Sequence, residues 1–220
     1  EALPLLYTIT SNGGLIRDER EDRVINRTLV DWQVTADILH ELESFGVFFC
    51  VHLDQVVYFQ NDDEQYVRNK YHIPGYMEVA LTDSAEGLVR QRREGAEKIF
   101  LRTDDEPLRQ EIRRRILAKY PVFCSSSSAH NLEFGVPGSS KGTSLRWLCA
   151  RLGVDGSEVM AFGDSRNDES MLSMDFGATI AMENADSALK KAAKYITKSN
   201  VELGVAYTIE ELLKRSYPGI

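Results

Sequence analysis

The stretch Val159-Met160-Ala161-Phe162-Gly163-Asp164-Ser165-Arg166-Asn167-Asp168 decides the fold of this chain. Its first four residues are apolar, and the segment Ser170-Met171-Leu172 follows directly. This order predicts a buried strand that ends in acidic residues and turns into a helix. Carboxylates at the carboxyl end of a parallel strand lie where open α/β sheets bind ligands. Two of them beside an asparagine indicate a site for a hard cation such as Mg²⁺, which often shares its shell with a substrate phosphate.

A second informative pair, Lys141-Gly142, lies upstream at the start of a predicted helix. A lysine on the helix of the preceding unit could supply positive charge to the same crevice as Asp164 and Asp168. The two stretches together indicate metal-assisted phosphoryl chemistry.

The composition limits the other classes of function. The chain has 220 residues, enough for one sizeable domain or two small ones, with 43% apolar and 27% charged residues. A net charge of −8 argues against binding to nucleic acid, which favours a basic surface. No apolar stretch approaches the roughly 18 residues that a membrane span needs, and no signal peptide is apparent. Three cysteines without paired or metal-type spacing predict reduced thiols in a cytoplasmic protein.

The first two thirds of the chain predict a mixture of strands and helices. The run 5–10 reads as a strand that stops at the turn signal Ser11-Asn12-Gly13-Gly14. The Ser125–Ser128 run reads as a loop or edge-strand turn. The remaining predicted elements are a hairpin over 15–26, a helix over 31–45 with Gly46 at its C-cap, a hairpin over 47–59, helices near 63–70, 83–94 and 106–119, and strands over 98–101 and 121–124.

From Lys141 onward, short helices and strands alternate, which predicts a parallel sheet with helices on its faces. The predicted helices cover 141–152, 168–174 and 185–193, and the predicted strands cover 158–162, 178–181 and 195–197. The expected fold class is therefore α/β. Residues 1–27 and 133–220 are expected to form a Rossmann-like core, into which an α+β unit over 28–132 is inserted.

Five short motifs occur in order along the chain. They are Ile9-Thr10-Ser11-Asn12-Gly13-Gly14-Leu15-Ile16, Ser140-Lys141-Gly142, Phe162–Asp168 followed by Met171-Leu172, Ile180-Ala181-Met182-Glu183-Asn184-Ala185, and Thr197-Lys198-Ser199-Asn200 with Gly204-Val205-Ala206. In this order and spacing the chain resembles the haloacid dehalogenase superfamily, in particular its Cof-type phosphatases with a large α/β cap (C2-type). Two positions depart from the family pattern: Glu183 replaces the usual glycine, and Leu203 stands where an acidic residue is common.

The family's first motif, Asp-x-Asp-Gly-Thr, is absent from residues 1–220, and so is the Ser/Thr motif that follows it. The one partial match, Val154-Asp155-Gly156-Ser157, lacks the first aspartate and reads as a turn. We therefore expect that an N-terminal piece on the order of 50 residues, about two βα units, precedes Glu1 in the parent protein.

The resemblance implies roles for several residues. Asp164 would be a direct Mg²⁺ ligand, and Asp168 a ligand or a partner that acts through water. Asn167 would orient that shell or hydrogen-bond the phosphate. Lys141 would neutralise the nucleophile's carboxylate and stabilise charge on the transferring oxygens. The implied substrate-binding residues are Asn12, Gly13, Lys141 and Asn167, and the implied catalytic residues are Lys141, Asp164, Asn167 and Asp168.

Plainer readings of these residues also exist. Asp168 taken alone is a helix N-cap, and Lys141 taken alone is an exposed residue at a helix start, where the dipole disfavours a cation. Asn12-Gly13 is equally readable as a simple turn or as part of an active-site entrance. Asn184 reads as the N-cap of a helix that begins at Ala185.

The function expected from the resemblance is Mg²⁺-dependent hydrolysis of small phosphorylated metabolites such as sugar phosphates. An aspartyl-phosphate would form on the nucleophile that lies outside this chain. The alternatives are a phosphosugar mutase, a dedicated sugar-phosphate phosphatase, or a truncated, non-catalytic fragment that binds a metal or a partner. The sequence says nothing about the oligomeric state or about which substrate is used.

Overall fold

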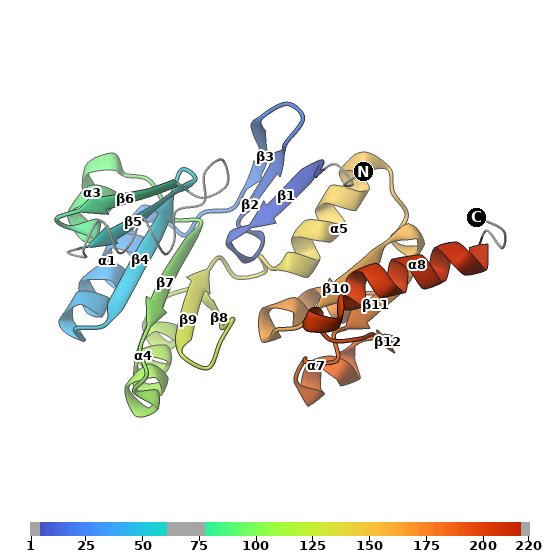
Figure 1. Cartoon of the computed structure of the whole chain (residues 1–220). Helices are drawn as coiled ribbons and strands as arrows, with labels where there is room; N and C mark the ends of the chain where they lie inside the picture. Colours follow the sequence, from blue (N-terminus) through green and yellow to red (C-terminus); the bar gives the residue numbers. More distant parts are fainter. Residues whose placement is uncertain (1–4, 61–77, 217–220) are drawn as a thin grey trace. The chain divides into compact units, whose positions relative to one another are not determined.

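The computed structural model describes residues 5–60 and 78–216, and contacts divide the chain into two compact units, Glu1–Ser139 and Ser140–Ile220 (Figure 1). The break falls seven residues after the expected end of the inserted unit at 132. Residue 133 lies inside strand β9, Asn131–Gly135, which pairs on both sides within the first unit. Residues 5–27 also fall in the first unit. The assignment of 1–27 to a Rossmann-like core therefore remains a prediction.

The first unit is built around a six-stranded sheet with the order β6-β5-β4-β7-β9-β8. All neighbours are antiparallel except β5 and β6. Its remaining strands are β4 (Phe48–Leu53), β5 (Val56–Gln60), β6 (Glu78–Thr82), β7 (Lys98–Arg102) and β8 (Phe123–Ser125).

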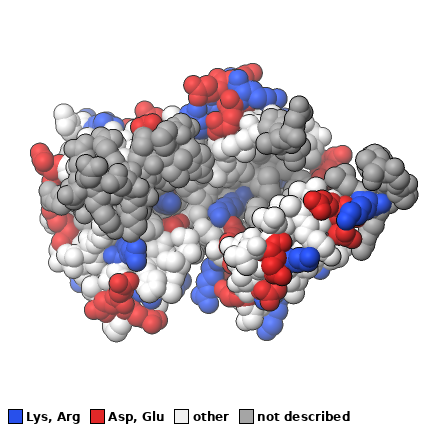
Figure 2. All heavy atoms as spheres, viewed as in Figure 1, with Lys and Arg blue, Asp and Glu red and all other residues white. Residues whose placement is uncertain are grey.

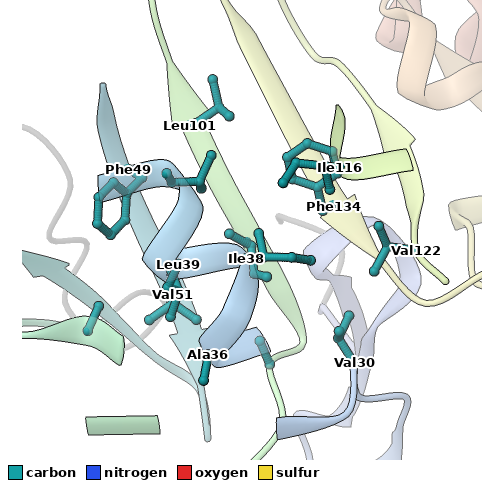
Figure 3. Close-up of a cluster of buried hydrophobic side chains, with 14 of the residues drawn as sticks. Val30, Ala36, Ile38, Leu39, Phe49, Val51, Leu101, Ile116, Val122 and Phe134 are labelled. Carbon is teal, nitrogen blue, oxygen red and sulfur yellow. The ribbon is translucent and has the colours of Figure 1, made fainter. Parts of the chain in front are cut away.

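Helices α1 (Trp32–Ser44), α3 (Ala85–Arg92) and α4 (Glu106–Lys119) share one large hydrophobic cluster with the sheet. Each begins with a side chain that accepts backbone amide hydrogens: Asp31, Ser84 and Asp105. Figure 3 shows part of the cluster, with side chains of α1, β4, β7 and β9 packed together. Its largest fully buried side chains are Ile38, Leu39, Leu42, Leu53, Ile99, Leu101, Ile112, Ile116 and Phe134.

The opposite face of this sheet is divided between apolar and polar side chains. Directly opposed residues of antiparallel strands point to the same face, so Phe100, Glu133 and Ser125 share one face. At the β4–β5–β6 end this face carries a small cluster of Cys50, Val57, Phe59 and Val79. At the β7–β9–β8 end it carries the polar side chains of Lys98, Glu133 and Ser125.

A separate three-stranded antiparallel sheet, β1-β2-β3, belongs to the same unit. It comprises β1 (Tyr7–Thr10), β2 (Leu15–Asp18) and β3 (Arg23–Arg27). A 3₁₀ turn, Ser11–Gly13, joins β1 to β2, so the sequence motif at 9–16 is a strand–turn–strand unit.

The second unit contains the expected parallel sheet, with the order β10-β11-β12. Its core is small, with six buried members that include Ala161, Leu172 and Phe176. The strands are β10 (Met160–Gly163), β11 (Ala178–Ala181) and β12 (Tyr195–Ile196), and the helices are α5 (Lys141–Leu152), α6 (Glu169–Leu172), α7 (Ser187–Ala192) and α8 (Gly204–Ser216). This α/β arrangement confirms the predicted fold class.

Several predicted elements need correction. Asn184 is not an N-cap, because the helix after β11 begins at Ser187 and Asp186 caps it. The Asn184 Oδ1 instead accepts a hydrogen bond from the backbone amide of Asn200 at 2.9 Å. The helix predicted near 63–70 lies outside the described residues. Strands β6 and β9 and helix α8 were not predicted. Val154–Ser157 is a turn as expected, since Asp155 caps a short 3₁₀ helix there.

The charged surface side chains and the free cysteines agree with what the composition of the chain predicted. In the view of Figure 2, acidic and basic side chains are interspersed. None of the described helices is long and apolar enough to cross a bilayer. Cys50, Cys124 and Cys149 are free thiols. Burial raises the pKa of Cys124 to about 11, so this thiol stays protonated at neutral pH and behaves as a packing group.

Candidate active site

Asp164 follows directly on the carboxyl end of β10, the strand that pairs in parallel with β11. Its side chain is exposed, and its Oδ1 accepts a hydrogen bond from the Ser165 hydroxyl at 3.0 Å. An exposed carboxylate at this edge of a parallel sheet is in the position where such folds bind ligands.

Asp168 lies four residues further on and is buried, with 6% of its surface exposed. Its Oδ2 accepts hydrogen bonds from the backbone amides of Asp164 and Ser165, each at 3.1 Å. Its side chain therefore holds the turn after β10 in place, rather than capping α6 as the plain reading proposed. Gly163 makes this possible, because a Cβ there would lie 2.5 Å from the Asp168 Cβ.

Lys141 is the first residue of α5, and Ser140 caps that helix in a reciprocal box with Thr143. Its Nζ lies 2.6 Å from the Asp168 Oδ1. The helix dipole disfavours a cation at this end, and the buried Asp168 carboxylate offsets that cost. Lys141 and Asp168, which the sequence separates by a helix and a strand, thus form one ion pair.

The glycine of the lysine motif, Gly142, is needed because there is no room for a side chain at this position. A Cβ at this position would lie 2.1 Å from the Ser170 carbonyl oxygen. The Gly142 amide also donates to the Ser170 hydroxyl at 3.3 Å. The start of α5 therefore packs against α6 at backbone distance, which brings Lys141 within reach of Asp168.

The remaining candidates are Asn167, Asn12 and Gly13. Asn167 lies in the 3₁₀ turn Arg166–Asp168, between the two aspartates. Asn12 and Gly13 belong to the first compact unit, in the turn after β1. The structure therefore groups Lys141, Asp164, Asn167 and Asp168 in one unit and the Asn12-Gly13 pair in the other.

The Asn12 side chain makes contacts that the sequence did not reveal. Its Nδ2 donates to the Ser125 hydroxyl at 3.0 Å and to the Glu133 Oε2. Asn12, Ser125 and Glu133 line a small hollow together with Ser11, Lys98 and Ser139, among others. The signal available in the sequence was an acidic residue inside the otherwise strand-like run Asn131-Leu132-Glu133-Phe134-Gly135.

The carboxylates of the second unit fit a hard cation in part. The Asp164 carboxylate is exposed and supplies the oxygen donor that Mg²⁺ prefers. Both oxygens of Asp168 already accept from an ammonium or from amides, which suits contact through water better than direct ligation. Within residues 5–60 and 78–216, no group of three or more His, Cys, Asp or Glu residues is arranged to hold a metal.

Comparison with known proteins agrees with this geometry. The family model of haloacid dehalogenase-like hydrolases matches residues 1–209. The chain belongs to this family. Its relatives are phosphatases, and we describe it below as a haloacid dehalogenase-like phosphatase.

Three relatives illustrate the similarity. The 5-amino-6-(5-phospho-D-ribitylamino)uracil phosphatase YwtE of Bacillus subtilis is 31% identical, over 95% of this chain and 79% of its own length. The phosphoglycolate phosphatase of Methanobrevibacter smithii is 43% identical over 44% of this chain and 40% of its own. A solved haloacid dehalogenase-like hydrolase from B. subtilis superposes with a TM-score of 0.81 at 26% identity, covering 94% of this chain and 79% of its own.

Proposed function

We propose that this haloacid dehalogenase-like phosphatase hydrolyses small phosphomonoesters, sugar phosphates among them, with Mg²⁺ as its cofactor. The observation that carries the proposal is the Lys141–Asp168 ion pair at 2.6 Å, with the exposed Asp164 at the end of the adjacent strand. A fixed cation beside an exposed carboxylate suits a reaction in which a phosphoryl group carries negative charge between two oxygens.

Lys141 has two tasks in this proposal. Its ammonium group neutralises negative charge on the attacking carboxylate, and it then stabilises the charge on the transferring phosphoryl oxygens. Asp168 keeps the ammonium in place before the substrate arrives, so that little reorganisation is needed during the reaction. Asn167 contributes a side-chain amide that orients the phosphate.

Asp164 is the residue that we expect to hold the metal directly. A bound Mg²⁺ offsets the repulsion between an anionic nucleophile and an anionic phosphate. Asp168 contributes by fixing the backbone amides of Asp164 and Ser165, which sets the direction of the Asp164 side chain.

The nucleophile in this proposal is a carboxylate from the family's Asp-x-Asp-Gly-Thr motif, which residues 1–220 do not contain. It attacks phosphorus and forms an aspartyl-phosphate, while the leaving alcohol takes a proton from the motif's second aspartate. That aspartate then removes a proton from water, which hydrolyses the acyl phosphate and releases inorganic phosphate.

The substrate class is a small phosphorylated metabolite, because the relatives named above act on such compounds. Those relatives differ in the leaving group, so the phosphoryl site is shared while the leaving-group site varies. A cytoplasmic location accords with the three free cysteines.

The test is a hydrolysis assay of the full-length protein with p-nitrophenyl phosphate and a panel of sugar phosphates. We expect release of inorganic phosphate that EDTA abolishes and added Mg²⁺ restores. Isomerised sugar phosphate without net release of phosphate would instead favour a mutase. No turnover of any phosphomonoester at saturating Mg²⁺ would overturn the proposal in favour of a non-catalytic protein.

A further inference from the structure

The first turn of α5 contains backbone amides that the helix itself cannot satisfy. The amide groups of the first turn of any α-helix lack an intrahelical acceptor, so side chains or other partners must supply one. In α5 the Ser140 hydroxyl accepts from the Thr143 amide at 3.2 Å. The Ser140 carbonyl oxygen accepts from the Ser144 amide at 3.0 Å, which begins the helical pattern. The Gly142 amide, which lies between these residues, needs an acceptor from outside the helix.

That acceptor is the hydroxyl of Ser170. Ser170 is the second residue of α6, and its Oγ accepts from the Gly142 amide at 3.3 Å. Gly142 is buried and Ser170 is partly buried. Loss of this acceptor would leave a buried amide without its partner, which costs more than an exposed hydrogen bond is worth. Ser170 thus caps α5 from a different helix.

The backbones of α5 and α6 also meet at this place. A Cβ at position 142 would lie 2.1 Å from the Ser170 carbonyl oxygen and 2.9 Å from the Met174 Cε. This close packing sets how near the two helices can come. Packing has little directional preference, whereas a hydrogen bond weakens steeply when it is misaligned. The Ser170 hydroxyl therefore sets how the first turn of α5 is rotated against α6.

Lys141 immediately precedes Gly142 and reaches the same segment of the chain. Its Nζ lies 2.6 Å from the Oδ1 of Asp168, two residues before Ser170. The start of α5 is thus joined to this segment by an ion pair and by a neighbouring hydrogen bond. A lysine side chain is flexible, and holding its ammonium group in one position costs conformational entropy. A fixed starting point on the backbone reduces that cost.

We propose that Ser170 is a positioning residue for Lys141. Its hydroxyl holds the first turn of α5, and the turn then directs the Lys141 side chain toward the Asp168 carboxylate. This inference rests on the proposed phosphatase function, in which the Lys141 ammonium group stabilises charge on the transferring oxygens. Ser170 itself need not touch the substrate. All of these residues lie within the second unit, Ser140–Ile220.

Amide hydrogen exchange, followed by NMR, tests the contact without an activity assay. The Gly142 amide should be protected in the wild type and should exchange about fivefold faster in Ser170→Ala, as expected for the loss of one hydrogen bond. The Thr143 amide, whose acceptor is Ser140, should change less and serves as the internal reference. Equal exchange of the Gly142 amide in the two proteins would overturn the inference.

The kinetic consequence should be a loss of kcat rather than of substrate binding. In the full-length protein at saturating Mg²⁺, Ser170→Ala should lower kcat for p-nitrophenyl phosphate about fivefold and change KM less than about twofold. Ser170→Cys keeps a weak acceptor of similar size and should lose less activity. Ser187→Ala, at the exposed first residue of α7, is the matched control and should leave kcat unchanged.

A double-mutant cycle with Lys141→Ala separates positioning from general damage to the fold. If Ser170 acts through Lys141, Ser170→Ala should change kcat less than about twofold once position 141 is already alanine. The same fold loss of kcat in both backgrounds would overturn the inference, because Ser170 would then act on another group or on the fold as a whole.

Thermal unfolding of each variant shows which of them can be compared. If Ser170→Ala unfolds at the assay temperature, Ser170→Cys takes its place in the cycle and in the exchange measurement. A wild type without turnover, whose Gly142 amide is protected and loses that protection in the variant, would overturn the phosphatase proposal alone. Turnover by the wild type with an unchanged kcat in every folded Ser170 variant would overturn the inference alone.

Discussion

The two units of this chain use their strands in different ways. In the first unit, one face of a six-stranded sheet packs against three helices in a large apolar cluster, and the polar groups gather on the opposite face. In the second unit, a three-stranded parallel sheet supports a small core, and the polar groups lie at a strand end. In the first unit, the position of a polar side chain is set by the face of the sheet to which it points. In the second unit, it is set by the residue at which a strand ends.

The difference has a consequence for how each unit tolerates change. A carboxylate on a sheet face, such as Glu133, is surrounded by side chains that can partly adjust. The Asp168 carboxylate is instead held by backbone amides and depends on close approach at Gly163 and Gly142. The site in the second unit should therefore be the less tolerant of small geometric changes.

The largest expected effect comes from Asp164→Asn. This change removes the exposed carboxylate that we assign to the metal while keeping the shape of the side chain. We expect kcat for p-nitrophenyl phosphate to fall about 10³-fold or more, since a metal supplies several kcal/mol of charge stabilisation. Circular dichroism should show an intact fold. Wild-type turnover in this variant would remove Asp164 from the site.

Lys141→Ala should have the next largest effect. Loss of the ammonium group should lower kcat on the order of 10²-fold, even at saturating Mg²⁺, because charge on the transferring oxygens is no longer stabilised. The exposed Lys191 on α7 provides the control, and Lys191→Ala should leave kcat unchanged. A change confined to metal affinity would contradict the assigned role of Lys141.

Gly142→Ala tests the backbone packing beneath the site. The added methyl group would lie 2.1 Å from the Ser170 carbonyl oxygen, so α5 or α6 must shift. We expect a loss of about 1–3 kcal/mol in the free energy of unfolding, measured in urea, together with lower activity. Gly135→Ala in the first unit meets no atom within 4 Å and is the matched control. Equal stability of the two variants would refute the contrast between the units.

Glu97→Gln should have the smallest effect. The change should appear in the pH dependence of the free energy of unfolding. Burial raises the pKa of Glu97, despite its ion pair with Arg27 at 2.7 Å. The folded state therefore holds this proton to higher pH than the unfolded state does. Its contribution to stability is present below the unfolded pKa and is lost as the pH rises through the folded pKa.

Unfolding of the wild type and of Glu97→Gln, measured from pH 4 to pH 7, checks this sign. The stability of the wild type should fall relative to the variant as the pH rises. Parallel curves for the wild type and Glu97→Gln would show that burial does not raise the pKa of Glu97.

Local sequence patterns predicted much of this fold. Helix α1 and the alternation that builds β10, α6 and β11 follow from periodicity. Gly46, predicted as the C-cap of α1, follows the C-cap residue Phe45 and ends the helix with a φ of +64°.

Strand β9 was missed although Asn131, Leu132, Glu133 and Phe134 alternate between polar and apolar residues. In the structure its polar residues are buried as well as its apolar ones. Asn131 hydrogen-bonds to the nearby serines Ser126–Ser128, whereas Glu133 also pairs with Asn12, 121 positions away. Local sequence does not encode the second pairing.

The candidate site was only partly predictable for the same reason. The motif predicted that Asp164 would follow a strand, and the structure has it directly after Gly163. The sequence predicted that Lys141 could supply charge to the same crevice as Asp164 and Asp168. It did not predict the ion pair of Lys141 with Asp168, because no periodicity relates a helix start to a strand end. The hydrogen bond between Asn12 and Glu133 joins a turn to strand β9, which lies far away in the sequence, and the motif that contains Asn12 did not indicate it.

The most direct test of the central claim is a calorimetric titration of Mg²⁺ into the full-length wild-type protein and into Asp164→Asn. The account predicts saturable binding by the wild type and an affinity at least about 100-fold weaker in the variant, since a charged oxygen ligand is lost. Lys191→Ala should bind Mg²⁺ as the wild type does. Equal affinity of the wild type and Asp164→Asn would contradict the account, because the metal would then not be held at the carboxyl end of β10.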